Sequence, residues 1–390
     1  MTTDDLRHLL DEYVALLDGP RNRSLLAETW LRPNLAYLGD VGVPREGKIP
    51  IIAAPHLSMW ARRMGIGASA LYLDPRTYLT VWLKREIGRF REIGDDRPLS
   101  RQVIMLIGAG FEVSLLGSRQ IYSETEDPWV DPAPVLERPE DVDRLELPDF
   151  HKSGLMPLAH RFYEELSELV VGAGLKVVFR DWARSPFAVV MHLRGVEPLL
   201  TDMIERPEFV SKLLDVVARS AIHYRNERAK FLGIPSERPE LGNDEVNVPS
   251  LSPQMYRDLV LPSEKAYASA FGGLTYWHSC GDVTPMLRAI REIPEITIFH
   301  VGPWTDLAKA AEVFGDVTLD ICIHSVTVYE GNDDATRTKI TQIVETCRDH
   351  GARSFSIRPG ILQAFGDVEK DLAAVGRWCR VAQETVAKLE

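Results

Sequence analysis

Leu274–Thr275–Tyr276–Trp277–His278–Ser279–Cys280–Gly281–Asp282 joins a strand pattern to two metal-binding side chains, and a helix-like run over 284–290 follows it. Because side chains alternate across a strand, His278 and Cys280 point to the same side. An imidazole and a thiolate are two of the ligands that a tetrahedral zinc site takes. Gly281–Asp282 ends the strand, so the pair falls at its carboxyl end, where barrel enzymes keep their chemistry.

Helices and strands alternate from residue 155 to the end of the chain. We predict strands at 175–180, 241–246, 274–278, 297–301, 317–323 and 354–357. We predict helices at 157–172, 186–203, 207–232, 253–271, 283–292, 305–314, 334–350 and 367–389. Strands separated by helices of this length pair in parallel. Since no Gly-rich phosphate fingerprint follows an early strand, the pattern favours an α/β fold of the (β/α)₈ TIM-barrel type with additional N-terminal helices.

The first part of the chain has a different pattern. Its predicted helices are 4–19, ended by Gly19–Pro20, then a segment within 21–40, most of 57–96, and 100–109. Its predicted strands are 49–54, 111–113 and 119–121.

Composition limits the class of protein. The chain has 45 Lys and Arg residues and 57 Asp and Glu residues, so its net charge is 45 − 57 = −12. This negative charge and the lack of a basic stripe argue against nucleic acid and anionic membrane surfaces as partners. No apolar run approaches 18 residues, the first residues are acidic, and four cysteines do not make a disulfide framework. We therefore expect a cytoplasmic enzyme without membrane contact; whether it is a homodimer is left open.

Four stretches resemble the uroporphyrinogen decarboxylase superfamily, and they occur in the order of that family. They are Gly108–Phe111 with Pro134–Asp149, Ser185–Gly195 with Arg206–Val210, Ser252–Tyr256 with Leu261–Pro262, and His278–Asp282. The resemblance implies a distorted (β/α)₈ barrel with extra N-terminal helices. We accordingly expect an N-terminal helical extension over residues 1–105 and a uroporphyrinogen-decarboxylase-like barrel over 106–390.

The superfamily has two main branches, and the motifs resemble one of them. The metal-free decarboxylases hold substrate carboxylates with an arginine-rich N-terminal segment, which this chain lacks. The zinc-dependent methyltransferases that work with corrinoid proteins or coenzyme M carry His-x-Cys, as at His278 and Cys280, and a later Cys. The final strand, 354–361, has no Cys and so departs from the family pattern; the third metal ligand is then either Cys322, one strand earlier, or a carboxylate such as that of Glu245. Packing roles for these residues are the alternative, since free cysteine is commonly buried.

Other polar and aromatic residues fall near predicted carboxyl ends of strands. Asp244 or Glu245 is a candidate fourth ligand or proton donor, and Arg180 is a third candidate catalytic residue. Arg180 and Arg358 can anchor an anionic substrate, or form structural ion pairs. The candidate substrate-binding residues are Trp182, Tyr276, His300 and Arg358.

The resemblance implies a zinc-dependent methyltransferase. Its zinc would act as a Lewis acid toward a small-molecule methyl donor. The missing Cys in the last strand and the aromatic residues near the site favour a methyl ether, so the reaction would be O-demethylation. A corrinoid (cobalamin) or a thiol would accept the methyl group. We expect any corrinoid to be carried by a separate protein, because we recognise no Asp-x-His-x-x-Gly corrinoid motif and no second Rossmann-like module in the chain. The alternatives are a metal-free decarboxylase and a non-catalytic corrinoid- or tetrapyrrole-binding protein.

Overall fold

The computed structural model describes residues 3–32, 41–53 and 55–389, and the chain divides into two compact units. Unit 1 comprises Met1–Met105, Phe162–Val178 and Leu307–Glu390. Unit 2 comprises Leu106–Arg161 and Phe179–Asp306. Residues 1–105 thus fall within unit 1, and the segment 106–390 contributes to both units.

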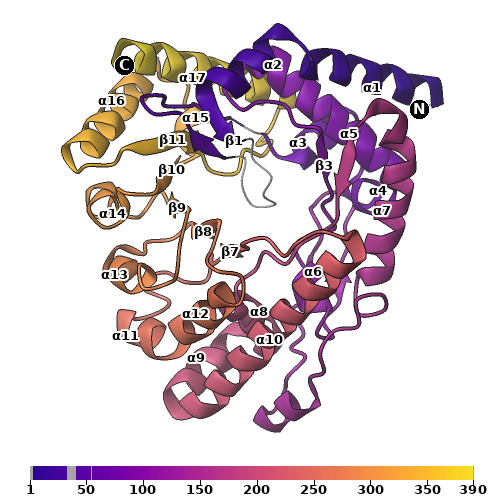
Figure 1. Cartoon of the computed structure of the whole chain (residues 1–390), viewed down its shortest axis with the longest axis vertical. Coiled ribbons are helices and arrows are strands. Elements are labelled where there is room, and N and C mark those ends of the chain that lie inside the picture. The colour runs from indigo at the N-terminus through magenta and orange to yellow at the C-terminus, as the bar shows by residue number, and fades with distance from the viewer. Residues whose placement is uncertain (1–2, 33–40, 54, 390) are drawn as a thin grey trace. The chain divides into compact units, whose positions relative to one another are not determined.

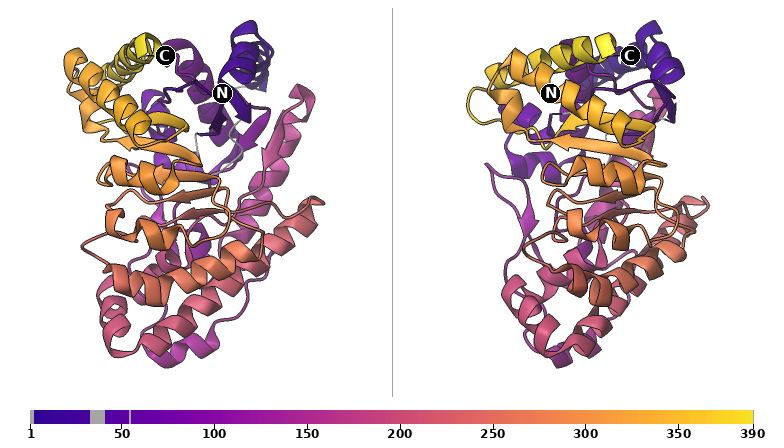
Figure 2. Two further views of the ribbon diagram at one scale, coloured as in Figure 1. Left: turned by 60° about the vertical axis from the view of Figure 1, so that its left-hand side comes forward. Right: turned by 90° about the vertical axis from the view of Figure 1, so that its left-hand side faces the viewer.

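Unit 1 contains the N-terminal helices and the last two strands of the chain. Its elements are α1 (Thr3–Leu17), α2 (Pro20–Ser24), η1 (Leu25–Thr29), β1 (Trp30–Arg32), β2 (Val43–Pro44), α3 (Leu57–Arg63), α4 (Ala68–Leu73), α5 (Pro75–Gly88), η2 (Arg89–Ile93), β3 (Gln102–Ile104), η4 (Val171–Ala173), β6 (Lys176–Val178), α14 (Leu307–Phe314), β10 (Thr318–Ile323), α15 (Val326–Tyr329), α16 (Asp333–Asp349), β11 (Ser354–Pro359) and α17 (Val368–Leu389). Strand β10 pairs in parallel with β11, and β3 with β6. Helices α16 and α17 lie side by side near the C-terminus (Figures 1 and 2).

Unit 2 contains three parallel strands and the helices that follow them. Its elements are α6 (Phe111–Ser114), β4 (Gln120–Ile121), β5 (Trp129–Val130), η3 (Pro139–Arg144), α8 (Pro186–Arg194), α9 (Val196–Glu205), α10 (Pro207–Leu232), β7 (Glu240–Gly242), α11 (Pro253–Met255), η5 (Tyr256–Val260), α12 (Leu261–Ser269), β8 (Tyr276–His278), η6 (Thr284–Met286), α13 (Leu287–Ile290) and β9 (Ile298–Val301). Helix α7 (Met156–Val170) runs from this unit into unit 1. Strand β7 pairs with β8, and β8 with β9, all in parallel.

The helices begin and end where local chemistry dictates. The Ser185 side chain accepts a hydrogen bond from the backbone N–H of Ala188 at 3.0 Å, and Pro186 occupies the first helical position of α8. Gly233 ends α10 in the left-handed conformation, at φ 63°. These residues explain why the predicted position of α10 agrees closely with the structure. The single helix predicted over 186–203 was wrong, because the chain is divided into α8 and α9 at Gly195, which has a φ of 88°.

The core is apolar along the central strands. Every residue of β9 and of β10 is buried, including His300 and Asp320. Continuous burial is typical of parallel strands that are covered on both faces. No helix in the described part of the chain is long and apolar enough to cross a membrane.

Several local predictions in the first part of the chain were wrong. The predicted helix at 100–109 contains strand β3, because its apolar run pairs with β6, which lies about 70 residues later. The predicted strand at 111–113 is the short helix α6, where the N–H of Ser114 donates to the carbonyl of Gly110. The helical segment predicted within 21–40 is, in contrast, confirmed by α2 and η1, which precede β1; residues 33–40 lie outside the described residues. The strand predicted at 49–54 is reduced to a parallel bridge from Ile51 to Ile357, and Ala54 is outside the described residues.

Candidate metal centre

The carboxyl ends of β7 and β8 bring together two loops that are distant in sequence. Gly242, the last residue of β7, lies opposite His278, the last residue of β8. The N–H of Asn243 then donates to the carbonyl oxygen of His278 at 2.8 Å, which continues the pairing one residue beyond the strand. The next residue, Asp244, therefore starts its loop beside the His278 side chain.

Asp244, His278 and Cys280 converge on one point. Their ligand atoms all lie within 4.8 Å of one another. Nε2 of His278 lies 3.1 Å from Oδ1 of Asp244 and 3.4 Å from Sγ of Cys280. The N–H of Cys280 also donates to Oδ1 of Asp244, at 3.2 Å. The structure thus brings together the predicted pair, His278 and Cys280, with one of the two carboxylates that the sequence offered.

The donor set fits zinc. Zinc binds His nitrogen at about 2.0–2.1 Å, carboxylate oxygen at about 2.0–2.2 Å and Cys sulfur at about 2.3 Å, so tetrahedral ligand atoms lie about 3.3–3.6 Å apart. The separations of 3.1 and 3.4 Å from His278 Nε2 are close to that range. The side chain of Asp244 is 58% exposed and that of His278 is 12% exposed. The cluster therefore faces solvent on the carboxylate side, as a site that admits substrate requires.

The electrostatics of Asp244 suit a metal ligand. Partial loss of hydration among the neighbouring protein atoms would raise the pKa, but the adjacent His278 and the hydrogen bonds from Cys280 outweigh that effect and hold the pKa of Asp244 far below its usual range. A carboxyl group with a depressed pKa is ionised at neutral pH. Asp244 therefore presents a carboxylate, the form that binds a cation.

Two glycines allow the loop that carries Cys280, residues 279–282 (the metal loop), to pack closely against its neighbours. A Cβ on Gly281 would lie 2.3 Å from the Cβ of Asn247. A Cβ on Gly302, just after β9, would lie 2.6 Å from the carbonyl oxygen of Ser279. The hydroxyl of Ser279 donates to the carbonyl of Val246 at 2.9 Å, which ties the metal loop to the loop after β7. Cys280 is therefore held from two sides.

Two of the predicted substrate-binding residues lie beneath the cluster. Tyr276 and His300 are buried. The hydroxyl of Tyr276 lies 3.4 Å from Nδ1 of His278, and the His300 ring centre lies 4.1 Å from that of His278. Nδ1 of His300 lies 2.8 Å from the carbonyl oxygen of Ser279. Both residues thus orient the imidazole and the metal loop, as groups behind a metal ligand do; their contact with a substrate stays a prediction.

The predicted arginines are paired with carboxylates of the protein. Nη2 of Arg180 donates to Oε1 of the buried Glu112 at 2.8 Å. Nε of Arg358, on β11 in unit 1, donates to both carboxylate oxygens of Asp320 at 2.9 Å. These ion pairs are the structural alternative considered for both residues. Trp182 is also buried, and its Nε1–H donates to the carbonyl of Arg184 at 2.9 Å.

Cys322 and Glu245 are not members of the described cluster. Cys322 is buried on β10 of unit 1, where its thiol donates to the carbonyl of Ile323 at 3.7 Å, and its role as a ligand stays a prediction. Glu245, adjacent to Asp244, instead pairs with Arg184 at 3.1 Å. The sequence predicted Asp244 and Glu245 together and gave no prediction for Arg184. The one available signal was that Arg184 directly precedes the Ser185 helix cap, in the loop between β6 and α8.

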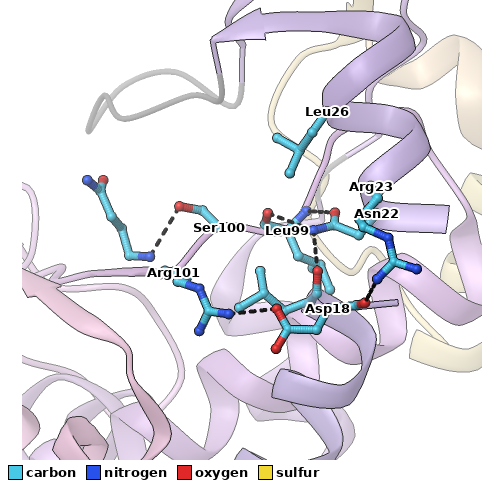
Figure 3. Close-up of a pocket in the computed structure, with 9 residues that line it drawn as sticks. Asp18, Asn22, Arg23, Leu26, Leu99, Ser100 and Arg101 are labelled. Atoms are coloured by element: carbon cyan, nitrogen blue, oxygen red, sulfur yellow. Dashed lines mark hydrogen bonds and ion pairs between the residues drawn. The ribbon is translucent and has the colours of Figure 1, made fainter. Parts of the chain in front are cut away.

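Unit 1 contains a cavity of about 620 Å³ that includes none of these residues. Figure 3 shows its lining, with Asn22 bonded to the backbone of Leu99 and Arg101 paired with Asp18. Both polar side chains already have partners within the protein. The cavity offers no group of metal-binding chemistry comparable to the cluster in unit 2.

Comparisons with known proteins agree with this architecture. The profile of the uroporphyrinogen decarboxylase (URO-D) family matches residues 102–354. The methylated-thiol–coenzyme M methyltransferase of Methanosarcina mazei is 26% identical over 190 residues, which are 46% of this chain and 47% of that protein. The match thus spans about half the length of that curated relative. A solved structure described as a methyltransferase from Methanosarcina mazei superposes with a TM-score of 0.61 at 17% identity, covering 87% of this chain and 94% of the other.

The structural match and the alternating parallel strands define an α/β protein of the TIM-barrel type, so the predicted fold class is confirmed. The family profile covers well over half of the 390 residues. The chain belongs to the uroporphyrinogen decarboxylase family.

Proposed function

We propose that this protein is a zinc-dependent methyltransferase that moves a methyl group from a small-molecule methyl ether to a corrinoid on a separate protein. The observation that carries the proposal is the convergence of Asp244, His278 and Cys280 at the carboxyl ends of β7 and β8. Family membership and the similarity to proteins named as methyltransferases support the reaction class.

The residues of the cluster have distinct roles in the proposal. Zinc, when bound, would supply Lewis-acid polarisation of the donor oxygen. Asp244, His278 and Cys280 would hold the ion, and the exposure of Asp244 leaves room for the donor to approach. Tyr276 and His300 would keep the His278 ring in place, because they contact it from the buried side.

The ligand types in the cluster favour an ether oxygen over a thiol sulfur as the substrate atom that zinc would bind. A site with two thiolates and one imidazole is soft and electron-rich. This cluster has one thiolate and one carboxylate, so a bound zinc would be a harder Lewis acid, which suits an oxygen ligand. The last strand, β11, contains no Cys, in line with that assignment.

The corrinoid is proposed to arrive on a partner protein. The prediction that the chain lacks the Asp-x-His-x-x-Gly motif was wrong, because Asp149–Phe150–His151–Lys152–Ser153–Gly154 has this spacing, which is that of corrinoid-binding modules. Here it forms a turn before α7, in which Oδ1 of Asp149 accepts from the N–H groups of His151 and Lys152 at 2.8 and 3.1 Å. A Cβ on Gly154 would lie 2.3 Å from the carbonyl of Ser114. Packing and turn formation therefore account for these residues.

Metal content and methyl transfer test the proposal together. We expect about one zinc per chain in the purified protein, and methyl transfer from an aryl methyl ether to added cob(I)alamin that stops on chelation and returns with zinc. His278→Ala and Cys280→Ser should lose zinc and activity, whereas Cys347→Ala, which alters a buried thiol on α16, should retain both. Decarboxylation without metal would replace the proposal with the first alternative. Corrinoid binding without turnover, unaffected by Cys280→Ser, would favour the second.

A further inference from the structure

Glu245, the residue after Asp244 of the candidate metal centre, has one carboxylate oxygen that is paired and one that is not paired within the described part of the chain. Its Oε1 accepts from Nη1 of Arg184 at 3.1 Å and lies 3.7 Å from Nε2 of His192. Its Oε2 is buried and has no hydrogen-bond partner among the described residues. A buried acceptor without a partner costs about 1–3 kcal/mol, so this oxygen requires a hydrogen-bond donor from a water molecule or a ligand.

The surroundings fix this carboxylate in position. Nε of Arg184 donates to the carbonyl of Ala109 at 3.1 Å, and its Nη1 lies 3.4 Å from Nε2 of His192. Arg184 is therefore anchored to the loop before α6 and to α8 at once. The ion pair with Arg184 therefore orients the Glu245 carboxylate through its Oε1.

An exposed indole lies next to the same arginine and histidine. Trp129, on β5, is 57% exposed. Its ring centre lies 5.8 Å from the guanidinium carbon of Arg184 and 6.1 Å from the His192 ring, which it meets edge to face. Gln120 on the paired strand β4 accepts a hydrogen bond from the N–H of Gly110 at 3.0 Å, which fixes the hairpin. The indole thus offers a flat apolar surface at a defined place.

This group of residues follows the same strand ends as the metal cluster. Arg184 forms a parallel bridge with Gly242, the last residue of β7. Glu245 directly follows Asp244, so their Cα atoms are about 3.8 Å apart. A small molecule bound against Glu245 would therefore contact the same loop that carries Asp244, a member of the cluster with His278 and Cys280.

We infer that Glu245, Arg184, His192 and Trp129 form a subsite for a planar, uncharged methyl ether that bears a hydroxyl group, such as a methoxyphenol. The charges of Arg184 and Glu245 cancel, so neither an anionic nor a cationic group is favoured there. The unsatisfied oxygen of Glu245 takes a hydrogen-bond donor, which a phenol supplies, and Trp129 takes an aromatic ring. The inference names the donor class for the proposed function and rests on it.

Equilibrium binding tests the subsite without methyl transfer. Zinc-loaded protein is titrated by calorimetry with 2-methoxyphenol and with 1,2-dimethoxybenzene, which differ only in the O–H group, and no corrinoid is added. We expect wild-type protein to bind the phenol at least about tenfold more tightly, since a hydrogen bond to a charged group gives a discrimination of that size or larger. Glu245→Gln, which keeps the size of the side chain, and Glu245→Ala should reduce the ratio of the affinity for 2-methoxyphenol to that for 1,2-dimethoxybenzene to about threefold or less. Trp129→Ala should weaken both ligands by similar factors.

The outcomes separate this inference from the proposed function. Equal affinities for the two ligands in wild-type protein, failure of both to bind, or an unchanged ratio in the folded Glu245 variants would each overturn the subsite. Methyl transfer from another donor would survive any of these results. Selective binding of the phenol by a protein that transfers no methyl group would support the subsite while rejecting the proposed reaction.

Discussion

Glu264 provides the sharpest test of how the candidate centre is supported. It is fully buried on α12, and its Oε2 accepts from the hydroxyl of Tyr256 at 2.9 Å and from Nε1 of Trp277 at 3.2 Å. Trp277 precedes His278 on β8. Burial raises the pKa of Glu264 from its ordinary 4.5 to about 7, although the hydrogen bonds from Trp277 and Tyr256 oppose the change.

The raised pKa fixes the direction of the pH effect. The folded protein binds the proton more tightly than the unfolded chain, so this stabilisation is complete below pH 4.5 and is lost as the pH rises through 7. Each pKa unit corresponds to about 1.4 kcal/mol. The difference between 4.5 and about 7 therefore corresponds to roughly 3 kcal/mol of unfolding free energy.

The perturbation is Glu264→Gln, which retains a carbonyl acceptor for Tyr256 and Trp277 and cannot ionise. We expect urea unfolding of chelator-treated protein to show that wild type loses stability between pH 5 and 8 relative to the variant, by up to roughly 3 kcal/mol. The exposed Glu345 on α16 provides the control, because Glu345→Gln should leave the pH profile of the wild type unchanged. Parallel profiles for Glu264→Gln and wild type would refute the reasoning.

Three further predictions concern the metal loop, its carboxylate and a buried ion pair. Gly302→Ala should weaken zinc binding, measured by competition with a chromophoric chelator, and lower the free energy of unfolding by about 1–3 kcal/mol, because its Cβ would lie 2.6 Å from a carbonyl oxygen of the metal loop. Gly172→Ala is the matched control, since its Cβ meets nothing within 4 Å. Equal behaviour of the two variants would contradict the packing argument. Asp244→Asn should lower zinc affinity at least about tenfold with an unchanged melting temperature of the chelated protein, and unaltered affinity would remove Asp244 from the ligand set. Arg180→Ala should destabilise the fold by about 3–5 kcal/mol in urea unfolding, because it leaves Glu112 buried and unpaired; a loss of substrate affinity with normal stability would show instead that the arginine binds substrate.

The sequence predicted the elements whose signals are local. Helix α10 begins at Pro207 and ends before Gly233, and α8 follows the Ser185 cap, so their boundaries can be read from neighbouring residues. Strand β3 and helix α6 could not be recognised in this way. The run that contains β3 becomes a strand because β6 pairs with it, and α6 begins shortly after Gly108, which has a left-handed backbone with φ of 108°. Short elements of this kind depend on contacts with residues that are distant in the sequence, so the neighbouring residues alone do not predict them.

In the candidate site too, the sequence predicted what depends on neighbouring residues and could not predict what depends on distant ones. His278 and Cys280 are two residues apart, so strand alternation alone places them together. Asp244 is 34 residues from His278, and the choice between it and Glu245 depends on the turn after β7. Consecutive side chains diverge, so when one of the two joins the imidazole the other points elsewhere, here toward Arg184.

That divergence has a consequence for how the site would work. The turn after β7 directs Asp244 to the metal cluster and Glu245 to Arg184, beside which His192 and Trp129 lie. One rigid segment would then set both the position of the ion and the position of the donor. Insertion of one residue in this turn should therefore impair zinc binding and ligand selectivity together, whereas Glu245→Gln should affect selectivity alone. A variant with an insertion that lost selectivity but kept wild-type zinc affinity would show that the two functions are positioned independently.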